Sequence, residues 1–222
     1  MTRSTITQRA LLCAALLPLL LVMSGCWVPA LIGGAVESYK ESSTRTVRSE
    51  YIGLDGKTYA VVVSADRAIQ AEHPELTAAM TDRINMRLHE HTQASGHIPS
   101  GTLLTYLLNR PEWTAIPLIE LAEDLGVDRL IYVELYEYRL NEVGNSYLWD
   151  GLASGTVAVI ETELGTSDFA FERQVQVGFP DGSGYGPMDI SRQVVTSALL
   201  ARFVDRSSWL FYDHEEPYYP DY

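Results

Sequence analysis

Residues 129–140, RLIYVELYEYRL, restrict the fold of this chain more than any other stretch. They combine branched aliphatic and aromatic side chains and closely follow Gly126, a residue type that commonly ends helices, so they predict a long strand. Two more strands are predicted within residues 147–163 and 169–179, each after a glycine-containing turn. Three consecutive strands joined by short turns indicate a meander, whose apolar face needs a covering layer.

The segments on either side of the meander supply that layer. Residues 58–64, TYAVVVS, predict a buried central strand. The helix behind Pro74 carries apolar side chains every four residues, at Leu76, Met80, Ile84 and Leu88. Two shorter helices are predicted to begin at residues 100 and 117. A last helix is predicted to follow Asp189, which can serve as its N-cap. The order strand, helices, three-strand meander, helix predicts an α/β fold, a two-layer sandwich on a mixed sheet with the first and last helices on one face.

Three tyrosines lie within the first meander strand. Alternation along the strand places Tyr132, Tyr136 and Tyr138 on one face. They are either part of the core beneath the helices, which we favour, or an aromatic surface for a protein partner.

The N-terminus has the features of an export signal. Arg3 and Arg9 precede an apolar stretch over residues 10–23, ALLCAALLPLLLVM. A membrane-spanning helix needs about 20 apolar residues, so this stretch is too short to span and fits a signal peptide, residues 1–25.

Residues 23–26 follow the apolar stretch directly. Met23, Ser24, Gly25 and Cys26 resemble the lipobox of bacterial lipoproteins, in which an aliphatic residue and two small residues precede a cysteine. The resemblance implies that residues 23–25 are read by the signal peptidase and that Cys26 carries a covalent lipid. The acyl chains would then hold the protein on a membrane. In enterobacterial lipoproteins an aspartate directly after the cysteine signals retention in the inner membrane. Trp27 stands at that position here, so the resemblance implies the outer membrane, with the domain facing the periplasm.

The charge balance excludes some partners. Sixteen Lys and Arg stand against 29 Asp and Glu, a net charge of −13. Such a chain repels phosphate backbones and anionic headgroups, so we expect no nucleic acid partner and no electrostatic membrane attachment. Of its two cysteines, Cys13 is removed with the signal peptide, which leaves Cys26 and no disulfide.

Three parts are expected in the mature chain. Residues 26–57 form a lipidated N-terminus and a polar tether, and residues 58–212 form the α/β domain. Residues 213–222, DHEEPYYPDY, form an acidic aromatic tail that we expect not to pack as an element. Aromatic side chains near the C-terminus are candidate contacts for a partner or a neighbouring copy: Trp209, Phe211, Tyr212, Tyr218, Tyr219 and Tyr222.

Catalytic and metal-binding patterns give little support to an enzyme. His89 and His91 lie two residues apart on a helix and diverge, with His97 beyond, so we expect no metal site and no cofactor other than the lipid. The glycines of residues 181–187, DGSGYGP, lack the βα repeat of a dinucleotide site. Nucleophile elbows, zinc motifs and phosphate loops are absent from the sequence, and we expect a protein without enzymatic activity.

The order of elements resembles a superfamily of bacterial envelope lipoproteins. Three stretches carry the resemblance: residues 59–88, residues 119–140, and the C-terminal helix with residues 203–212. The superfamily includes the curli secretion channel lipoprotein, the Pel polysaccharide export lipoprotein, lipoprotein activators of penicillin-binding proteins, and the N-terminal domain of the Tol-system propeller protein. The resemblance implies an accessory or assembly subunit of a secretion or polymer-export system, able to form homo-oligomers. A periplasm-spanning regulator of a cell-wall synthase, suited to the long tether, and an exported enzyme remain alternatives.

Overall fold

The computed structural model describes residues 44–142 and 144–217. The predicted signal peptide, Cys26 with its lipobox, most of the tether, and Tyr218, Tyr219 and Tyr222 lie outside the described residues. The described chain divides into a larger unit, residues 47–214, and a smaller one made of residues 44–46 and 215–217.

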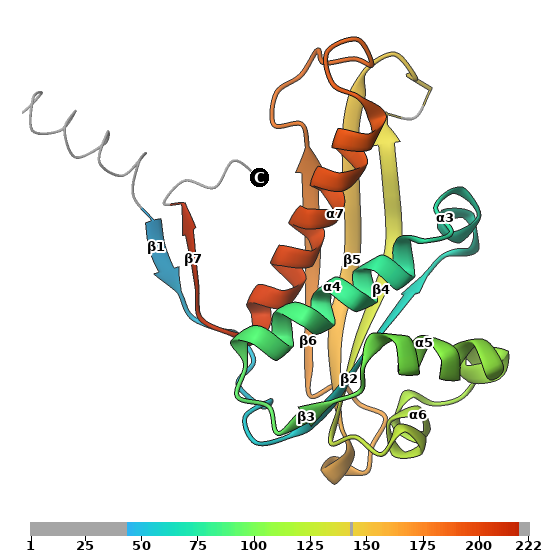
Figure 1. Cartoon of the computed structure of the whole chain (residues 1–222), viewed down its shortest axis with the longest axis vertical. Helices are drawn as coiled ribbons and strands as arrows, with labels where there is room; N and C mark the ends of the chain where they lie inside the picture. Colours follow the sequence, from blue (N-terminus) through green and yellow to red (C-terminus); the bar gives the residue numbers. More distant parts are fainter. Residues whose placement is uncertain (1–43, 143, 218–222) are drawn as a thin grey trace, which may run out of the picture. The chain divides into compact units, whose positions relative to one another are not determined.

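A five-stranded mixed sheet forms the centre of the larger unit (Figure 1). Its strand order is β3-β2-β4-β5-β6. The strands are β2 (Thr58–Ala65), β3 (Gly96–His97), β4 (Arg129–Asn141), β5 (Trp149–Glu161) and β6 (Phe171–Phe179). β2 is parallel to both β3 and β4, and β4, β5 and β6 form the predicted antiparallel meander.

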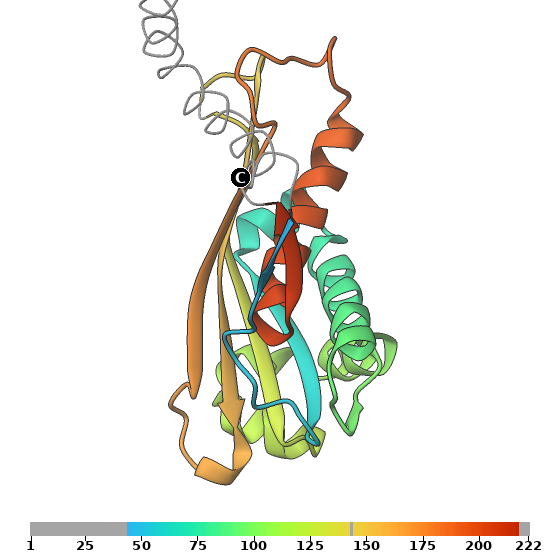
Figure 2. The same cartoon turned by 90° about the vertical axis from the view of Figure 1, so that its left-hand side faces the viewer.

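Helices cover one face of this sheet and part of the other. The helices are α3 (Arg67–Glu72), α4 (Leu76–His91), α5 (Ser100–Asn109), α6 (Leu118–Leu125) and α7 (Arg192–Ser208). Short 3₁₀ turns span η1 (Pro111–Ala115), η2 (Thr162–Leu164) and η3 (Trp209–Phe211). α4 and α7 pack together on one face, as predicted (Figure 2). α5 and α6 cover the β2 end of the opposite face, so the predicted α/β sandwich is confirmed with a partial third layer.

β2 alternates between two apolar clusters. Tyr59, Val61 and Val63 join the core beneath α4 and α7, whereas Ala60 and Val62 join the cluster under α5 and α6. Burial of both faces explains why the strand reads as a continuous apolar run without alternation.

The register of β4 shifts between Leu135 and Glu137. Leu135 and Tyr138, three residues apart, both lie in the core beneath α4 and α7, whereas Tyr136 is exposed. Tyr132 packs with the cluster on the other face. The expectation that the three tyrosines share one face is therefore wrong, because an extra residue in a strand exchanges its faces.

The domain begins earlier than residue 58. Tyr51 and Leu54 are buried in the core, and the backbone N–H groups of Glu50 and Tyr51 both donate to the carbonyl of Leu210 at 2.9 Å. The last residues of the predicted tether therefore belong to the domain.

The start of α7 also differs from prediction. Ser191 is the N-cap of α7 and accepts a hydrogen bond from the N–H of Val194, while Asp189 accepts one from the N–H of Gly186 within the preceding loop.

Two short strands form a separate two-stranded sheet, β1 (Thr44–Val47) with β7 (His214–Pro217). Arg45 Nη2 bonds Glu216 Oε1 at 2.5 Å, and Glu216 is buried. The tail was expected not to pack as an element, and that expectation is wrong for residues 214–217.

Candidate functional site

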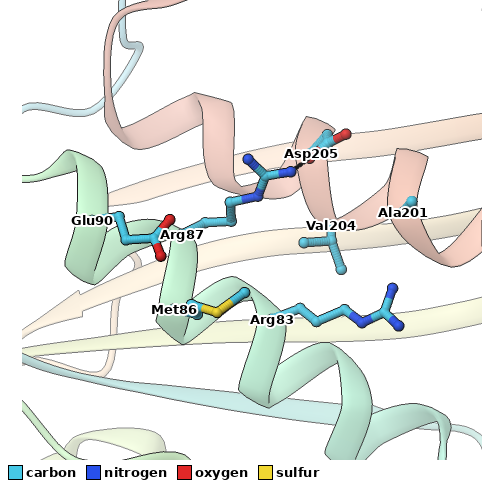
Figure 3. A pocket seen from close by; sticks show the side chains of 7 residues that line it. All are labelled: Arg83, Met86, Arg87, Glu90, Ala201, Val204 and Asp205. Carbon is cyan, nitrogen blue, oxygen red and sulfur yellow. Dashed lines mark hydrogen bonds and ion pairs between the residues drawn. The ribbon is translucent and has the colours of Figure 1, made fainter.

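α4 and α7 enclose a groove of about 310 Å³ on the helical face of the larger unit (Figure 3). Its lining comes from α4 and α7 alone: Arg83, Met86, Arg87, Glu90, Ala201, Val204 and Asp205. Helical spacing creates the arrangement, since Met80, Ile84 and Leu88 turn into the core and leave the next face of α4 for the groove. Val204 is buried at the side of α7, and Met86 is 51% exposed.

One ion pair joins the two helices across the groove. Arg87 Nη2 lies 2.9 Å from Asp205 Oδ1. Burial raises the pKa of the Asp205 carboxyl above its ordinary value, and the charge of Arg87 acts in the opposite direction. Arg83 points along the groove away from this pair and has no ion-pair partner within residues 44–142 and 144–217 (Figure 3). The groove therefore offers a guanidinium to an incoming acid.

Aromatic side chains of the C-terminal segment pack inside the larger unit. Phe211 and Tyr212 are 5% and 8% exposed, and Tyr212 stacks on His91 with ring centroids 4.6 Å apart. Trp209 stacks on His214 at 4.5 Å. This corrects the expectation for Phe211 and Tyr212, which fill the chain's own core and offer no surface to a partner. Partner contacts by Tyr218, Tyr219 and Tyr222 stay a prediction.

The part of the second sheet face that α5 and α6 leave uncovered, over β4, β5 and β6, is polar. Strand register places Glu134, Thr156 and Gln174 in one row across β4, β5 and β6, and Glu137, Ser154 and Gln176 in the next. The middle strand contributes only short side chains to these rows. Tyr136, 45% exposed, lies beside them on β4. Glu137 is bound by Arg139 and Ser154 is buried, so the groups open to a ligand are the Glu134 carboxylate, the Gln174 and Gln176 amides and Tyr136. Such groups can hydrogen-bond to and stack on a hydroxyl-rich ligand.

A buried arginine holds a charged cluster at the other end of β4. Arg129 is 6% exposed, and its guanidinium contacts Glu161 at 3.6 Å, bonds Glu163, and donates to the carbonyl of Gly53 at 3.1 Å. Lys57 also binds Glu163, and together these cations hold the pKa of that carboxyl at about 2. The Tyr51 hydroxyl donates to Glu161 at 2.8 Å.

Sequence reasoning missed this cluster, because its members are spread over more than 100 residues. The register of β4 with β5, which sets Arg129 opposite Glu161, is what brings them together. The cluster fixes the N-terminal segment to the sheet.

A second hollow, also about 310 Å³, lies between the β4–β5 turn and the loop after β6. Of its three acids, Glu142, Asp150 and Asp181, the last two are bound by Arg139 and Arg202. We find no set of reactive groups in it.

His89 and His91 have different ring partners, in line with the expectation that the two side chains diverge. His89 and His97, from α4 and β3, have ring centroids 4.5 Å apart, and His91 lies against Tyr212. Within the part of the chain that the structure describes, no three His, Cys, Asp or Glu side chains gather as a metal site. The expectation of no metal and no cofactor stays a prediction.

No helix of the described residues has the length and apolar character to cross a membrane. The chain matches no family model and no curated protein. Among solved structures it is similar to the PelC dodecamer from Paraburkholderia phytofirmans, with 13% identity over 76% of this chain and 96% of that one, at a TM-score of 0.43.

Two further solved structures are similar to this chain. Lipoprotein GNA1162 from Neisseria meningitidis shares 11% identity over 65% of this chain and 93% of its own, at a TM-score of 0.44. A DUF330 protein from Xanthomonas campestris shares 9% identity over 74% of this chain and 84% of its own, at a TM-score of 0.47.

Proposed function

We propose that this chain is a non-enzymatic lipoprotein, anchored to the outer membrane through Cys26, with its domain facing the periplasm. In this proposal it is an accessory or assembly subunit of an envelope secretion or polymer-export system. The observation that carries the proposal is the sequence at residues 23–26, a lipobox directly behind a short apolar stretch.

The uncovered sheet face supports a role with polymers. Glu134, Gln174 and Gln176 flank the short side chains of β5, and Tyr136 stands beside them. Amides and carboxylates bond hydroxyl groups, and an exposed aromatic ring packs against an apolar sugar face. No comparable combination of exposed aromatic and amide groups lines the groove between α4 and α7.

Regulation of a cell-wall synthase is the alternative function. The polar stretch over residues 37–50 favours it, because a regulator must reach across the periplasm. With β1 paired to β7, and Tyr51 and Leu54 in the core, however, the segment available as a spacer shrinks from residues 26–57 to residues 26–43. Its fully extended length falls from about 110 Å to about 60 Å.

Affinity capture of the acylated protein from detergent-solubilised envelopes separates the two functions. We expect components of a secretion or polymer-export assembly to be recovered with the parent protein, and lost when Cys26→Ala releases the chain from membranes. Recovery of a cell-wall synthase in place of such components would favour the alternative. A Cys26→Ala protein that still sediments with salt-washed membranes would contradict the lipid anchor.

A further inference from the structure

Arg83 lines the groove and has no ion-pair partner within the described residues. Many of the other arginines are held in ion pairs, for example Arg87 with Asp205 and Arg129 with Glu163. Arg67 resembles Arg83 in having no ion pair within the described residues, but it does not line the groove. An exposed guanidinium beside an apolar side chain is a common binding element for the carboxylate of a peptide.

The groove has two chemically different ends. Arg83 and Glu90 lie seven residues apart on α4, which corresponds to about 10.5 Å along the helix axis. Met86 lies between them and Val204 opposite, so an apolar strip runs through the middle of the groove beside the Arg87–Asp205 ion pair (Figure 3). A segment that fits must carry an acid at one end, a hydrogen-bond donor at the other and an apolar group between them.

Residues 218–222, YYPDY, have this order of groups. In the polyproline II conformation that Pro220 favours, residues three apart share a face and Tyr218 would lie about 9 Å from Asp221, close to the separation of Arg83 and Glu90. Asp221 can then pair with Arg83, the Tyr218 hydroxyl can donate to Glu90, and the ring between them can pack on the Met86 thioether.

The tail acids that the structure describes are already engaged within their own chain. Asp213 accepts a hydrogen bond from the N–H of Ser49 at 2.9 Å, and Glu216 is bound by Arg45. Glu215 accepts a bond from the Thr44 hydroxyl at 3.4 Å. Asp221 is therefore the tail acid that we assign to Arg83.

We propose that the groove between α4 and α7 binds residues 218–222 of a second copy of this chain. Each copy carries one groove and one such segment, so the contact is head-to-tail and repeats from copy to copy. The choice of a second copy as the occupant of the groove rests on the proposed lipid anchor, because copies anchored to one membrane surface meet at high effective concentration. The contact itself goes beyond the proposed function, which a monomer could also serve.

Photo-crosslinking of the purified acylated chain in detergent tests the contact. The photoreactive amino acid p-benzoylphenylalanine replaces Tyr219, and ¹⁴N- and ¹⁵N-labelled preparations are mixed in equal amounts. We expect mass spectrometry to find crosslinks from position 219 to residues 83–90 or 201–205 that join one isotopic label to the other. Crosslinks that stay within one label, or that reach only other surfaces, would overturn the proposal.

Charge variants make the test specific. Arg83→Glu is expected to lower the yield of mixed-label crosslinks at least fivefold, whereas Arg67→Glu, the same charge change outside the groove, leaves it unchanged. Combining Arg83→Asp with Asp221→Arg restores the yield, because the pair is rebuilt with its charges exchanged. Equal yields for Arg83→Glu and Arg67→Glu would also overturn the proposal.

These results are independent of the envelope role. The crosslinks are measured on purified protein, so a chain that captures no export component can still show them. Conversely, absence of the contact leaves the capture experiment of the proposed function unaffected.

Discussion

Arg129 shows at the scale of one residue how a buried charge organises the chain. Its guanidinium has two carboxylates and the carbonyls of Gly53 and Asp128 around it. A buried ion pair is weak evidence for stability as a whole, but removal of one partner leaves the others uncompensated. The arginine therefore fixes where the N-terminal segment lies, whatever its net contribution to the free energy of folding.

Loss of the guanidinium is expected to be costly. Arg129→Ala leaves Glu161 and the carbonyl of Gly53 without their partner and is expected to lower the free energy of unfolding by about 3–5 kcal/mol. Arg173→Ala removes an exposed pair with Glu50 and is expected to cost at most about 1 kcal/mol. Urea unfolding of both variants measures the difference, and equal losses would contradict the role given to Arg129.

The Glu163 carboxyl has a pH dependence that follows from its two cations. Its pKa is about 2 against an ordinary 4.5, so its stabilising effect is complete above the ordinary value and is lost as the pH falls toward 2. The free energies of unfolding of the parent and Glu163→Gln should differ most above pH 5 and converge near pH 2. Urea unfolding of both proteins between pH 2 and pH 5 measures this difference. A difference that does not change with pH would contradict the prediction.

Individual helices and strands can be predicted from the sequence where the spacing of apolar residues is regular, and cannot be predicted where that spacing is interrupted. α4 and β2 could be predicted, because apolar residues every four positions indicate a helix and a short β-branched apolar run indicates a strand buried on both faces. The faces of β4 could not, because the register shift between Leu135 and Glu137 depends on pairing with β5. α3, six residues long with one buried side chain, leaves almost no periodic signal.

A close approach between β5 and its neighbours gives a test at this scale. A Cβ added at Gly155 would lie 2.6 Å from the Glu134 carbonyl oxygen and 2.9 Å from the Phe203 ring. Gly155→Ala is thus expected to destabilise the domain by about 1–3 kcal/mol, because backbone and core must both shift.

Gly178→Ala is the matched control on the adjacent strand. A Cβ there meets only the Gly151 carbonyl oxygen at 3.6 Å, an ordinary contact, so the change is expected to stay within about 0.5 kcal/mol. Thermal unfolding of the two variants side by side decides, and a Gly155→Ala protein as stable as the control would mean that β5 and α7 are not packed this closely.

For the whole molecule, the difference between prediction and structure concerns where the domain begins. The polar composition of residues 37–50 predicts a spacer, and the apolar residues that follow it, Tyr51, Ile52 and Leu54, are too few and irregularly spaced to predict an element. Tyr51 and Leu54 belong to the core because Leu210, Phe171 and Phe211 come from far along the chain to meet them. Nor could the groove be predicted, since it requires the packing of α4 against α7. The lipobox, in contrast, is readable from four residues.

Truncation tests this boundary. A chain that starts at residue 48 keeps Tyr51 and Leu54 and is expected to melt within a few degrees of the mature protein. A chain that starts at residue 58 loses both side chains from the core and is expected to lose most of its stability, since a large buried side chain alone contributes about 2–5 kcal/mol. Similar melting temperatures for both truncated chains would mean that the domain begins near residue 58.

The bonds from Glu50 and Tyr51 to Leu210 also set the order of events when the protein is made. A chain that crosses a membrane with its N-terminus first presents Tyr51 and the β2 strand early, but the carbonyl and the aromatic ring that receive them emerge almost last. β2 likewise waits for β4, its parallel neighbour, across more than 60 residues. In the proposed export, translocation is therefore nearly finished before the core can close, and the early strands are exposed during that interval, when protection by a chaperone matters most.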